Sequence, residues 1–375
     1  MSALTLSAVA QEAAEKEPAH TTHEGELLAS CDVCMPISVP RGPMQVLFQP
    51  GFQAGVDHQY TALKDLKQDG QSISNPYGEK IDSNSTQFHF TYNLSPKAGF
   101  VVTVPYHNRS YRRSDGAGNV ESGTVSGLGD IIVGGRYAPV TKFTENSTFI
   151  WTVDAGMKLP TGSTRMLTED TAHNPTLQSA ATGASAEGDS HSDGHDHNAQ
   201  RGILAHAGHD HSADASGQAS SGDASSSHHS PVGGHDLTLG SGSVDGVLGT
   251  GIFFRQGDFY ATAGGQYVLR STGAVGYRYG DLITWRVAPG YLFVNNSEQV
   301  MGIQVNVSGE HHDPNRVYGA RDHGYADTIY AGPEFMAQGE NLSLNLGLDL
   351  PVKYHGEGMT LAPDYRARVH FNWRF

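Results

Sequence analysis

The sequence is poor in cysteine, in basic residues and in long apolar runs. No window of about 18 apolar residues occurs, which excludes a helical inner-membrane protein. Lysine and arginine number 24 against 39 acidic residues, and the net charge of −15 argues against a nucleic-acid partner. Only two cysteines are present, Cys31 and Cys34, and an exported protein can hold such a pair as a disulfide or as metal ligands.

What the sequence does contain is a repeated alternation of apolar and polar residues. The stretch 342–350 places leucine at every second position and Ser343, Asn345, Gly347 and Asp349 between them. Such alternation indicates a β-strand with two unlike faces. A transmembrane barrel strand needs only about 10 residues of this kind, with lipid on one face and water on the other. About twelve such segments occur, near residues 45–60, 86–95, 98–109, 126–138, 147–159, 242–254, 258–270, 279–293, 299–310, 324–336, 341–352 and 364–375.

The connections between these segments alternate in length. They are short after the second, fourth, sixth, eighth and tenth segments and mostly longer after the others. An outer-membrane barrel has short periplasmic turns and long outer loops. We therefore predict an all-β fold, a transmembrane antiparallel β-barrel of about twelve strands, in the outer membrane of a Gram-negative bacterium with both termini periplasmic. A soluble β-sandwich is the alternative, but it does not explain the alternation of connection lengths.

The final segment, "DYRARVHFNWRF", has a large aromatic face and a charged or polar face. Phe371, Trp373 and Phe375 lie on the aromatic face. Aromatic side chains form girdles at both membrane interfaces of outer-membrane barrels. We predict that these three residues face lipid and belong to the periplasmic girdle.

Four stretches resemble one bacterial outer-membrane family. They are "GLGDIIVGGRYAP", "DAGMKLPTGS", "LGSGSVDGVLGTGIFF" and "GYRYGDLITWRVAPGYLF". From about residue 40 to residue 375, with one interruption, the chain is similar to the transporter family labelled MetA-pathway of phenol degradation. The resemblance implies an outer-membrane, channel-like barrel, and it brings no catalytic motif.

The interruption is a stretch rich in Ala, Ser, Gly, Asp and His at residues 165–236. Its composition buries too little apolar surface to offset the entropy of ordering, so we predict a long disordered loop on the extracellular side. Two HDH triplets and their neighbours predict weak binding of copper, zinc or nickel, without a required cofactor. A solvated linker with incidental histidines is the alternative. The candidate ligands are His191, His195, His197, His206, His209, His211, His228, His229 and His235.

A second set of candidate metal ligands precedes the first strand. His20 and His23 have H-x2-H spacing, and Cys31 and Cys34 have C-x2-C spacing, which together permit one four-ligand zinc or copper site. A simple disulfide loop, or exposed ligands that do not meet, is the alternative.

The first residues indicate export. The run that ends at Ala10 has small residues at the positions of a cleavage site, so residues 1–10 are interpreted as the remnant of a signal peptide. An ordinary disordered N-terminus is the alternative. The predicted order is then a periplasmic segment at 11–41, barrel strands one to five at 42–164, the His-rich loop at 165–236 and strands six to twelve at 237–375.

Charged residues that alternate with the apolar face are expected to line the barrel lumen. Barrel interiors are polar and crossed charges join strands, so a structural role is one explanation. The other is that Arg286, Arg366, Arg368 and His370 line one wall and set selectivity, as rings of charge do in pores. The candidate lumen residues are His89, Arg136, Asp154, Lys158, Asp245, Arg286, Glu334, Asp349, Arg366, Arg368 and His370.

Together these patterns predict a channel or transport component for small solutes, in contact with outer-membrane lipid, with a loop that binds transition-metal ions. A non-conducting surface metal scavenger or scaffold is the alternative. We do not expect an enzyme. "HNRS" (His107, Ser110) and "SGEHHDP" (Ser308, His311) contain residue types that hydrolases use, but neither carries a nucleophile signature. The solute, the direction of transport and the oligomeric state stay open.

Overall fold

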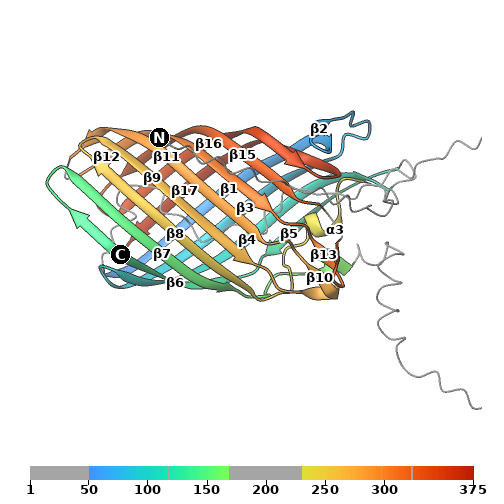
Figure 1. Ribbon diagram of the computed structural model, residues 1–375, viewed down its shortest axis with the longest axis horizontal. Coiled ribbons are helices and arrows are strands. Elements are labelled where there is room, and N and C mark those ends of the chain that lie inside the picture. Colours follow the sequence, from blue (N-terminus) through green and yellow to red (C-terminus); the bar gives the residue numbers. More distant parts are fainter. Residues whose placement is uncertain (1–49, 116–118, 169–229, 297, 322–323) are drawn as a thin grey trace, which may run out of the picture.

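The chain forms a closed barrel of antiparallel strands (Figure 1). The computed structural model describes residues 50–115, 119–168, 230–296, 298–321 and 324–375. In this part of the chain twelve strands follow one another around the ring in chain order, and β17 pairs with β1 to close it. The strands are β1 (Gly51–Gln68), β3 (Lys80–Ser95), β4 (Ala98–Ser114), β6 (Ile132–Phe143), β7 (Ser147–Lys158), β8 (Asp245–Gln256), β9 (Phe259–Leu269), β11 (Leu282–Asn295), β12 (Val300–His312), β15 (Ala326–Gln338), β16 (Leu342–Gly356) and β17 (Met359–Arg374).

Several shorter elements lie at the end with the long connections (Figure 1). β5 (Val120–Leu128) pairs with β4, and β2 (Gln71–Ser72) pairs with β1. A small separate sheet contains β10 (Tyr277–Arg278), β13 (Arg316–Val317) and β14 (Ala320–Arg321). The described helical turns include α3 (Gly234–Leu237) and η2 (Ala274–Gly276). Among the described helices, none is long and apolar enough to cross a membrane.

The turns reproduce the alternation seen in the sequence. Short turns join β3 to β4, β6 to β7, β8 to β9, β11 to β12 and β15 to β16 at one end of the barrel. The amide of Phe375 donates a hydrogen bond to the carbonyl of Phe52 at the same end. The predicted fold class, an all-β antiparallel barrel of about twelve strands, is therefore confirmed.

One connection at the other end differs from the expected length. The sequence predicts a longer loop before the last strand, but only Glu357 and Gly358 separate β16 from β17. Gly358 has a φ of 80°, which a glycine adopts without steric cost, and its amide donates to Asp69 Oδ1 at 2.8 Å. The two strands extend the barrel wall where the alternation pattern indicated a loop.

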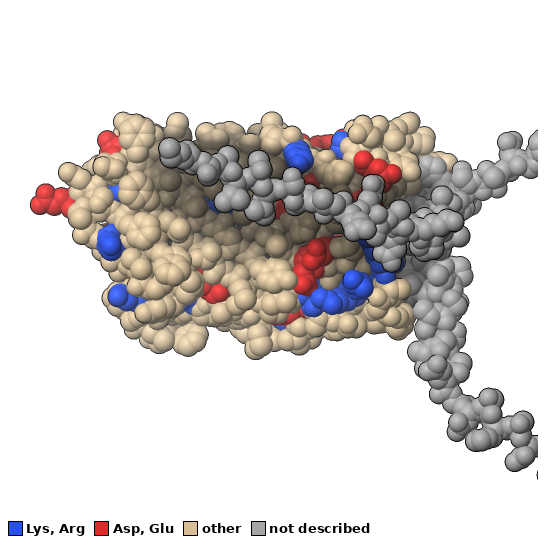
Figure 2. Space-filling view, viewed as in Figure 1, with Lys and Arg blue, Asp and Glu red and all other residues tan. Residues whose placement is uncertain are grey.

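The outer face of the barrel is apolar over a broad surface. Large side chains such as Phe90, Leu348 and Trp373 are about two-fifths exposed (42 %, 44 % and 43 %). Figure 2 shows a mostly uncharged face, with Lys, Arg, Asp and Glu gathered toward its ends. A contiguous apolar surface of this size is costly in water and marks a surface that another apolar phase covers. The strand alternation thus produces a lipid-facing wall.

The inner face is partly filled by apolar side chains at the end with the short turns. We call the buried cluster at this end the short-turn cluster. All of its members lie on barrel strands. Tyr260 lies over Gly290, where a Cβ would be 2.4 Å from the tyrosine ring, so glycine makes room for this packing. The members are Ala138, Ile150, Phe253, Tyr260, Leu292, Val300 and Met336.

The opposite end is filled by the two ends of the sequence insert. Residues 159–168 and 230–244, together called the plug, fold into the mouth of the barrel, and Met166, Leu167, Val232 and Leu237 are buried there. The sequence prediction placed all of 165–236 in an outer loop, whereas Met166, Leu167 and most of residues 231–236 are buried in the mouth. Burying one such side chain is worth about 1.5–3 kcal/mol, which explains why these few apolar residues leave the solvent. Residues 169–229 lie outside the described part of the chain.

Candidate functional site: the polar interior and the plugged mouth

A network of charged side chains crosses five strands of the inner wall. Arg286 on β11 contacts Glu334 on β15 at 2.6 Å, and Arg368 on β17 contacts Asp349 on β16 at 2.8 Å. Asn306 on β12 donates to Asp349 at 2.9 Å. This charge ladder is largely buried, so each cation is stabilised by a carboxylate and not by bulk water. Its members are Arg286, Asn306, Glu310, Glu334, Asp349, Arg366 and Arg368.

The seam where the barrel closes carries a carboxylate between two histidines. His370 Nδ1 on β17 lies 2.5 Å from Asp57 Oδ1 on β1. His89 Nε2 on β3 lies 2.7 Å from the other oxygen of Asp57, and its Nδ1 lies 2.9 Å from Thr103 Oγ1 on β4. All three ionisable groups are buried. The contacts tie the last strand to the first three strands of the ring.

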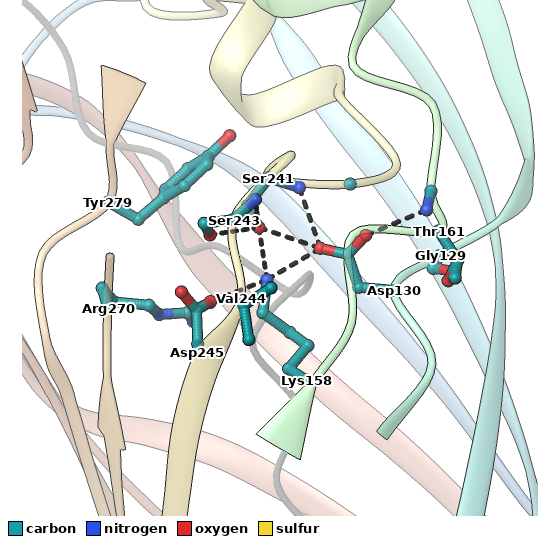
Figure 3. Close-up of polar contacts among 12 residues, drawn as sticks. Gly129, Asp130, Lys158, Thr161, Ser241, Ser243, Val244, Asp245, Arg270 and Tyr279 are labelled. Atoms are coloured by element: carbon teal, nitrogen blue, oxygen red, sulfur yellow. Dashed lines mark hydrogen bonds and ion pairs between the residues drawn. The ribbon is translucent and has the colours of Figure 1, made fainter. Parts of the chain in front are cut away.

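A third group of charges lies where β7 ends and the plug begins (Figure 3). The Nζ of Lys158 lies 2.7 Å from Asp130 and 2.8 Å from Asp245, and it also contacts the hydroxyl of Ser241. Asp245 in turn contacts Arg270 at 3.0 Å. The side chain of Lys158 is only 3 % exposed, so its charge depends on these partners. We call Asp130, Lys158, Ser241, Asp245 and Arg270 the Lys158 clamp.

Asp130 is the centre of hydrogen bonding in the clamp. Its carboxylate accepts the backbone amides of Ser241 and Gly162, both at 2.9 Å. Asp130 lies in the connection between β5 and β6, outside the strands. Burial by itself would raise the pKa of this carboxyl, but the neighbouring Lys158 ammonium and the two amides lower the pKa below its usual value. Asp130 is therefore held as an anion.

Away from the clamp, the plug also contacts the wall and the long connections next to it. Arg109 on β4 donates to the backbone carbonyls of Asp236 and Thr238, and the hydroxyl of Tyr279 donates to the carbonyl of His235 at 2.9 Å. Two apolar clusters add to these bonds. One contains Met166, Val232 and Leu237 of the plug with Leu63, Leu66, Ile81, Tyr111 and Leu361 of the wall, and the other contains Leu167 with Tyr277, Tyr279 and Val317.

The candidate lumen residues all lie on the inner face of the barrel. The structure distributes them over the charge ladder, the closing seam, the Lys158 clamp and one further pair, Arg136 and Asp154, which face each other across β6 and β7 at 2.5 Å. Asp57 and Glu310 were missed, although both occupy inward positions of alternating segments. Asp130 and Arg270 were also missed. Both lie just beyond the strand ends, but inside the alternating segments 126–138 and 258–270 and in phase with their buried residues.

The candidate metal ligands fall mostly outside the described residues. His235 is the exception: it lies buried in the plug, with Nε2 at 3.2 Å from Asp236 Oδ1 and its ring stacked on Tyr277. Its expected place in an outer loop is therefore corrected. In the described ranges, no group of three or more His, Cys, Asp or Glu side chains is arranged to hold a metal ion. The ligands beyond these ranges are His20, His23, Cys31, Cys34, His191, His195, His197, His206, His209, His211, His228 and His229.

The two stretches with hydrolase residue types do not assemble into one site. His107 is buried in the barrel whereas Ser110, three residues further along β4, bonds to Thr124 at the outer surface. Ser308 and His311 are likewise three residues apart on β12, which places them on opposite faces. His311 contacts Asp327 at 2.7 Å instead. The geometry of neither pair supports nucleophilic catalysis.

Comparison with known proteins shows that the fold is shared with solved outer-membrane barrels. No family model and no curated protein matches the sequence. The chain is similar to an outer membrane channel from Pseudomonas putida F1, with a TM-score of 0.54 and 12 % identity over 89 % of this chain and 100 % of that chain. It also matches the β domain of a Bordetella autotransporter (TM-score 0.39, 8 % identity, 87 % of this chain and 100 % of that chain). A FadL homologue from Pseudomonas aeruginosa matches with a TM-score of 0.35 and 10 % identity, over 94 % of this chain and 100 % of that chain.

Proposed function

We propose that the protein is a channel for small solutes in the outer membrane of a Gram-negative bacterium. The observation that carries the proposal is a closed ring of twelve strands that is apolar outside and polar inside. A lipid-facing wall around a polar interior is what a pore requires. The likeness to the Pseudomonas putida channel and the resemblance to the MetA-pathway transporter family support the same function.

The orientation follows from the same features. We propose that the short turns, together with Phe52 and Phe375, face the periplasm, and that the plug faces outward. Outer-membrane barrels have short periplasmic turns and longer outer connections, and the long connections here lie at the plugged end. A protease added to intact cells should then cut the long connections and spare the short turns.

The inner wall favours small hydrogen-bonding solutes over ions of one sign. Arg136, Arg286, Arg366 and Arg368 each contact a carboxylate, so the described wall has no surplus ring of cations. The other buried polar residues of the barrel include neutral hydroxyl and amide side chains, such as Thr61, Ser83, Ser85, Gln87 and Asn345. Weak ion selectivity is the expected consequence.

Purified full-length protein in planar bilayers and in liposomes tests the proposal. We expect small stepwise currents and swelling of liposomes in small neutral solutes, because the plug and the short-turn cluster narrow the path. The channel function would be overturned if the protein gave no current and no swelling although its heat modifiability showed that it was folded. That result would favour the non-conducting surface scavenger or scaffold.

We further propose that the His-rich stretch gives this channel a role in metal handling. The support is the sequence alone, with two HDH triplets among carboxylates. Deleting residues 185–226 removes most of these histidines and leaves the plug residues in place. Calorimetry with copper, zinc and nickel near pH 7 should show several weak sites in the intact protein and few in the deleted one. Equal capacity in both would locate the ligands elsewhere, with His20, His23, Cys31 and Cys34 as the next candidates.

A further inference from the structure

The two limbs of the plug are bonded to each other as well as to the wall. The carbonyl of Ser163 in the first limb accepts the amides of Leu239 and Gly240 in the second, at 3.2 and 3.1 Å. Gly162 and Gly240 pack so closely that a Cβ on Gly240 would lie 2.7 Å from Gly162 Cα. The limbs therefore form one unit, although the whole insert separates them in the sequence.

This unit meets the barrel wall at the Lys158 clamp (Figure 3). Lys158 is the last residue of β7, Asp245 is the first residue of β8, and Ser241 belongs to the plug. One ammonium group thus joins a carboxylate of the β5–β6 connection, a carboxylate of β8 and a hydroxyl of the plug. Two carboxylates that share one cation lie close together, and without the cation they repel each other in a dry site.

We infer that Lys158 is the positioning residue of a latch that holds the plug across the mouth of the barrel. With Lys158 in place, Asp130 binds the backbone and side chain of Ser241 and keeps the second limb against the wall. Without Lys158, the contact between its ammonium and the Ser241 hydroxyl is lost. Asp130 and Asp245 then repel each other, which moves the Asp130 carboxylate that binds Ser241. The inference deepens the proposed channel function, because release of the plug would widen the pore.

Lys158→Met tests the latch, and Arg136→Met is its matched control. Arg136 on β6 pairs with Asp154 on β7, four residues further from the mouth than Lys158, and like Lys158 it lies inside the barrel. Both variants remove a cation from a carboxylate partner, but only Lys158 contacts the plug. Folded protein would be selected in each case by heat modifiability.

Two readouts are needed, and one does not depend on conduction. A Val232→Cys reporter in a Cys31→Ser, Cys34→Ser background places a thiol in the plug, at a position that is 2 % exposed. Its modification by a membrane-impermeant maleimide measures how often the plug opens. We expect the rate to rise at least about tenfold with Lys158→Met, the result of a change of about 1.4 kcal/mol in the opening equilibrium. It should stay unchanged with Arg136→Met, and the bilayer conductance should rise only in the first variant.

The outcomes separate the latch from the channel. Equal labelling rates in wild type and Lys158→Met would overturn the latch, whatever the conductance. Faster labelling without current in any variant would support the latch and overturn the channel function. Should Lys158→Met fail to fold, Ser241→Ala provides a milder test, because it removes the hydroxyl that touches Lys158 and Asp130 and keeps the amide. An unchanged rate in that variant as well would refute the inference.

Discussion

The two ends of the barrel are each partly closed, and in different ways. At the short-turn end, the buried cluster comes from β6, β7, β8, β9, β11, β12 and β15 and their edges, which the backbone ladder holds in place. At the other end, the wall supplies five members of the main cluster, and the other three, Met166, Val232 and Leu237, come from the insert. The first closure is inseparable from the barrel, whereas the second depends on contacts that can break while the ring of strands stays intact.

The largest effect is expected at the short-turn end. Phe253→Ala removes a side chain that is 2 % exposed and leaves a cavity among strand residues that cannot move together. We expect the free energy of unfolding of the whole barrel to fall by about 3–5 kcal/mol. Urea unfolding in detergent or lipid, followed by loss of heat modifiability, would measure it. If the free energy of unfolding fell by no more than it does for an ordinary surface substitution, the packing around Phe253 would be contradicted.

The equivalent change in the plug should separate the two closures. Leu237→Ala removes a fully buried side chain at a local cost of about 2–5 kcal/mol, but its cavity lies between the insert and the wall. We expect faster labelling at the Val232→Cys reporter and a barrel that unfolds at the same urea concentration as wild type. If the barrel were destabilised as much as by Phe253→Ala, the plug would be part of the folding core and the comparison would fail.

Of the two ends, the plugged end is the one that acid should weaken. The Asp130 carboxyl has a pKa below its usual value because of Lys158 and the amides of Ser241 and Gly162, with Asp245 and Arg270 as the other charged groups of the clamp. A lowered folded-state pKa stabilises the plug above the unfolded value of about 3.9 and loses this contribution as pH falls through the folded-state value. We therefore expect conductance that is steady from neutral pH to about pH 4 and rises in stronger acid. If the conductance of Asp130→Asn rose in acid in the same way as that of the wild type, Asp130 would be excluded as the titrating group.

The smallest effect concerns the end of the last strand. Phe375 packs against Phe52 with ring centroids 5.5 Å apart, and an aromatic pair of this kind contributes about 0.5–1.5 kcal/mol beyond its buried area. Phe375→Ala should reduce the folded fraction in outer membranes modestly. Phe259→Ala is the matched control, since it breaks the pair with Tyr291 (5.0 Å) at the same end of the barrel but away from the seam. If both variants lost the same share of folded protein, Phe375 would have no special role in closing the seam between β1 and β17.

Alternation along the sequence was sufficient to predict the barrel and much of its interior. Period-two spacing assigned Arg286, Glu334 and Arg368 to the inner face, and the structure places all three there in one network. The same rule would have found Asp57 and Glu310, because a strand allows each side chain only two directions. Partners across the lumen could not be predicted, since pairing depends on which strands become neighbours and on their register.

The closed mouth was decided by the tertiary structure. Met166, Val232 and Leu237 stand alone or, as Met166 beside Leu167, in a pair at the ends of a polar insert, and nothing local tells them from exposed loop residues. They are buried only because the curvature of the ring brings β1, β3, β4 and β17 around them, and because Lys158 finds Asp130 and Asp245 from distant segments. The sequence by itself determined the lipid-facing wall and the polar interior, because both follow from the period of a strand. What fills that interior depends on contacts between residues far apart in the chain, and those exist only once the ring has closed.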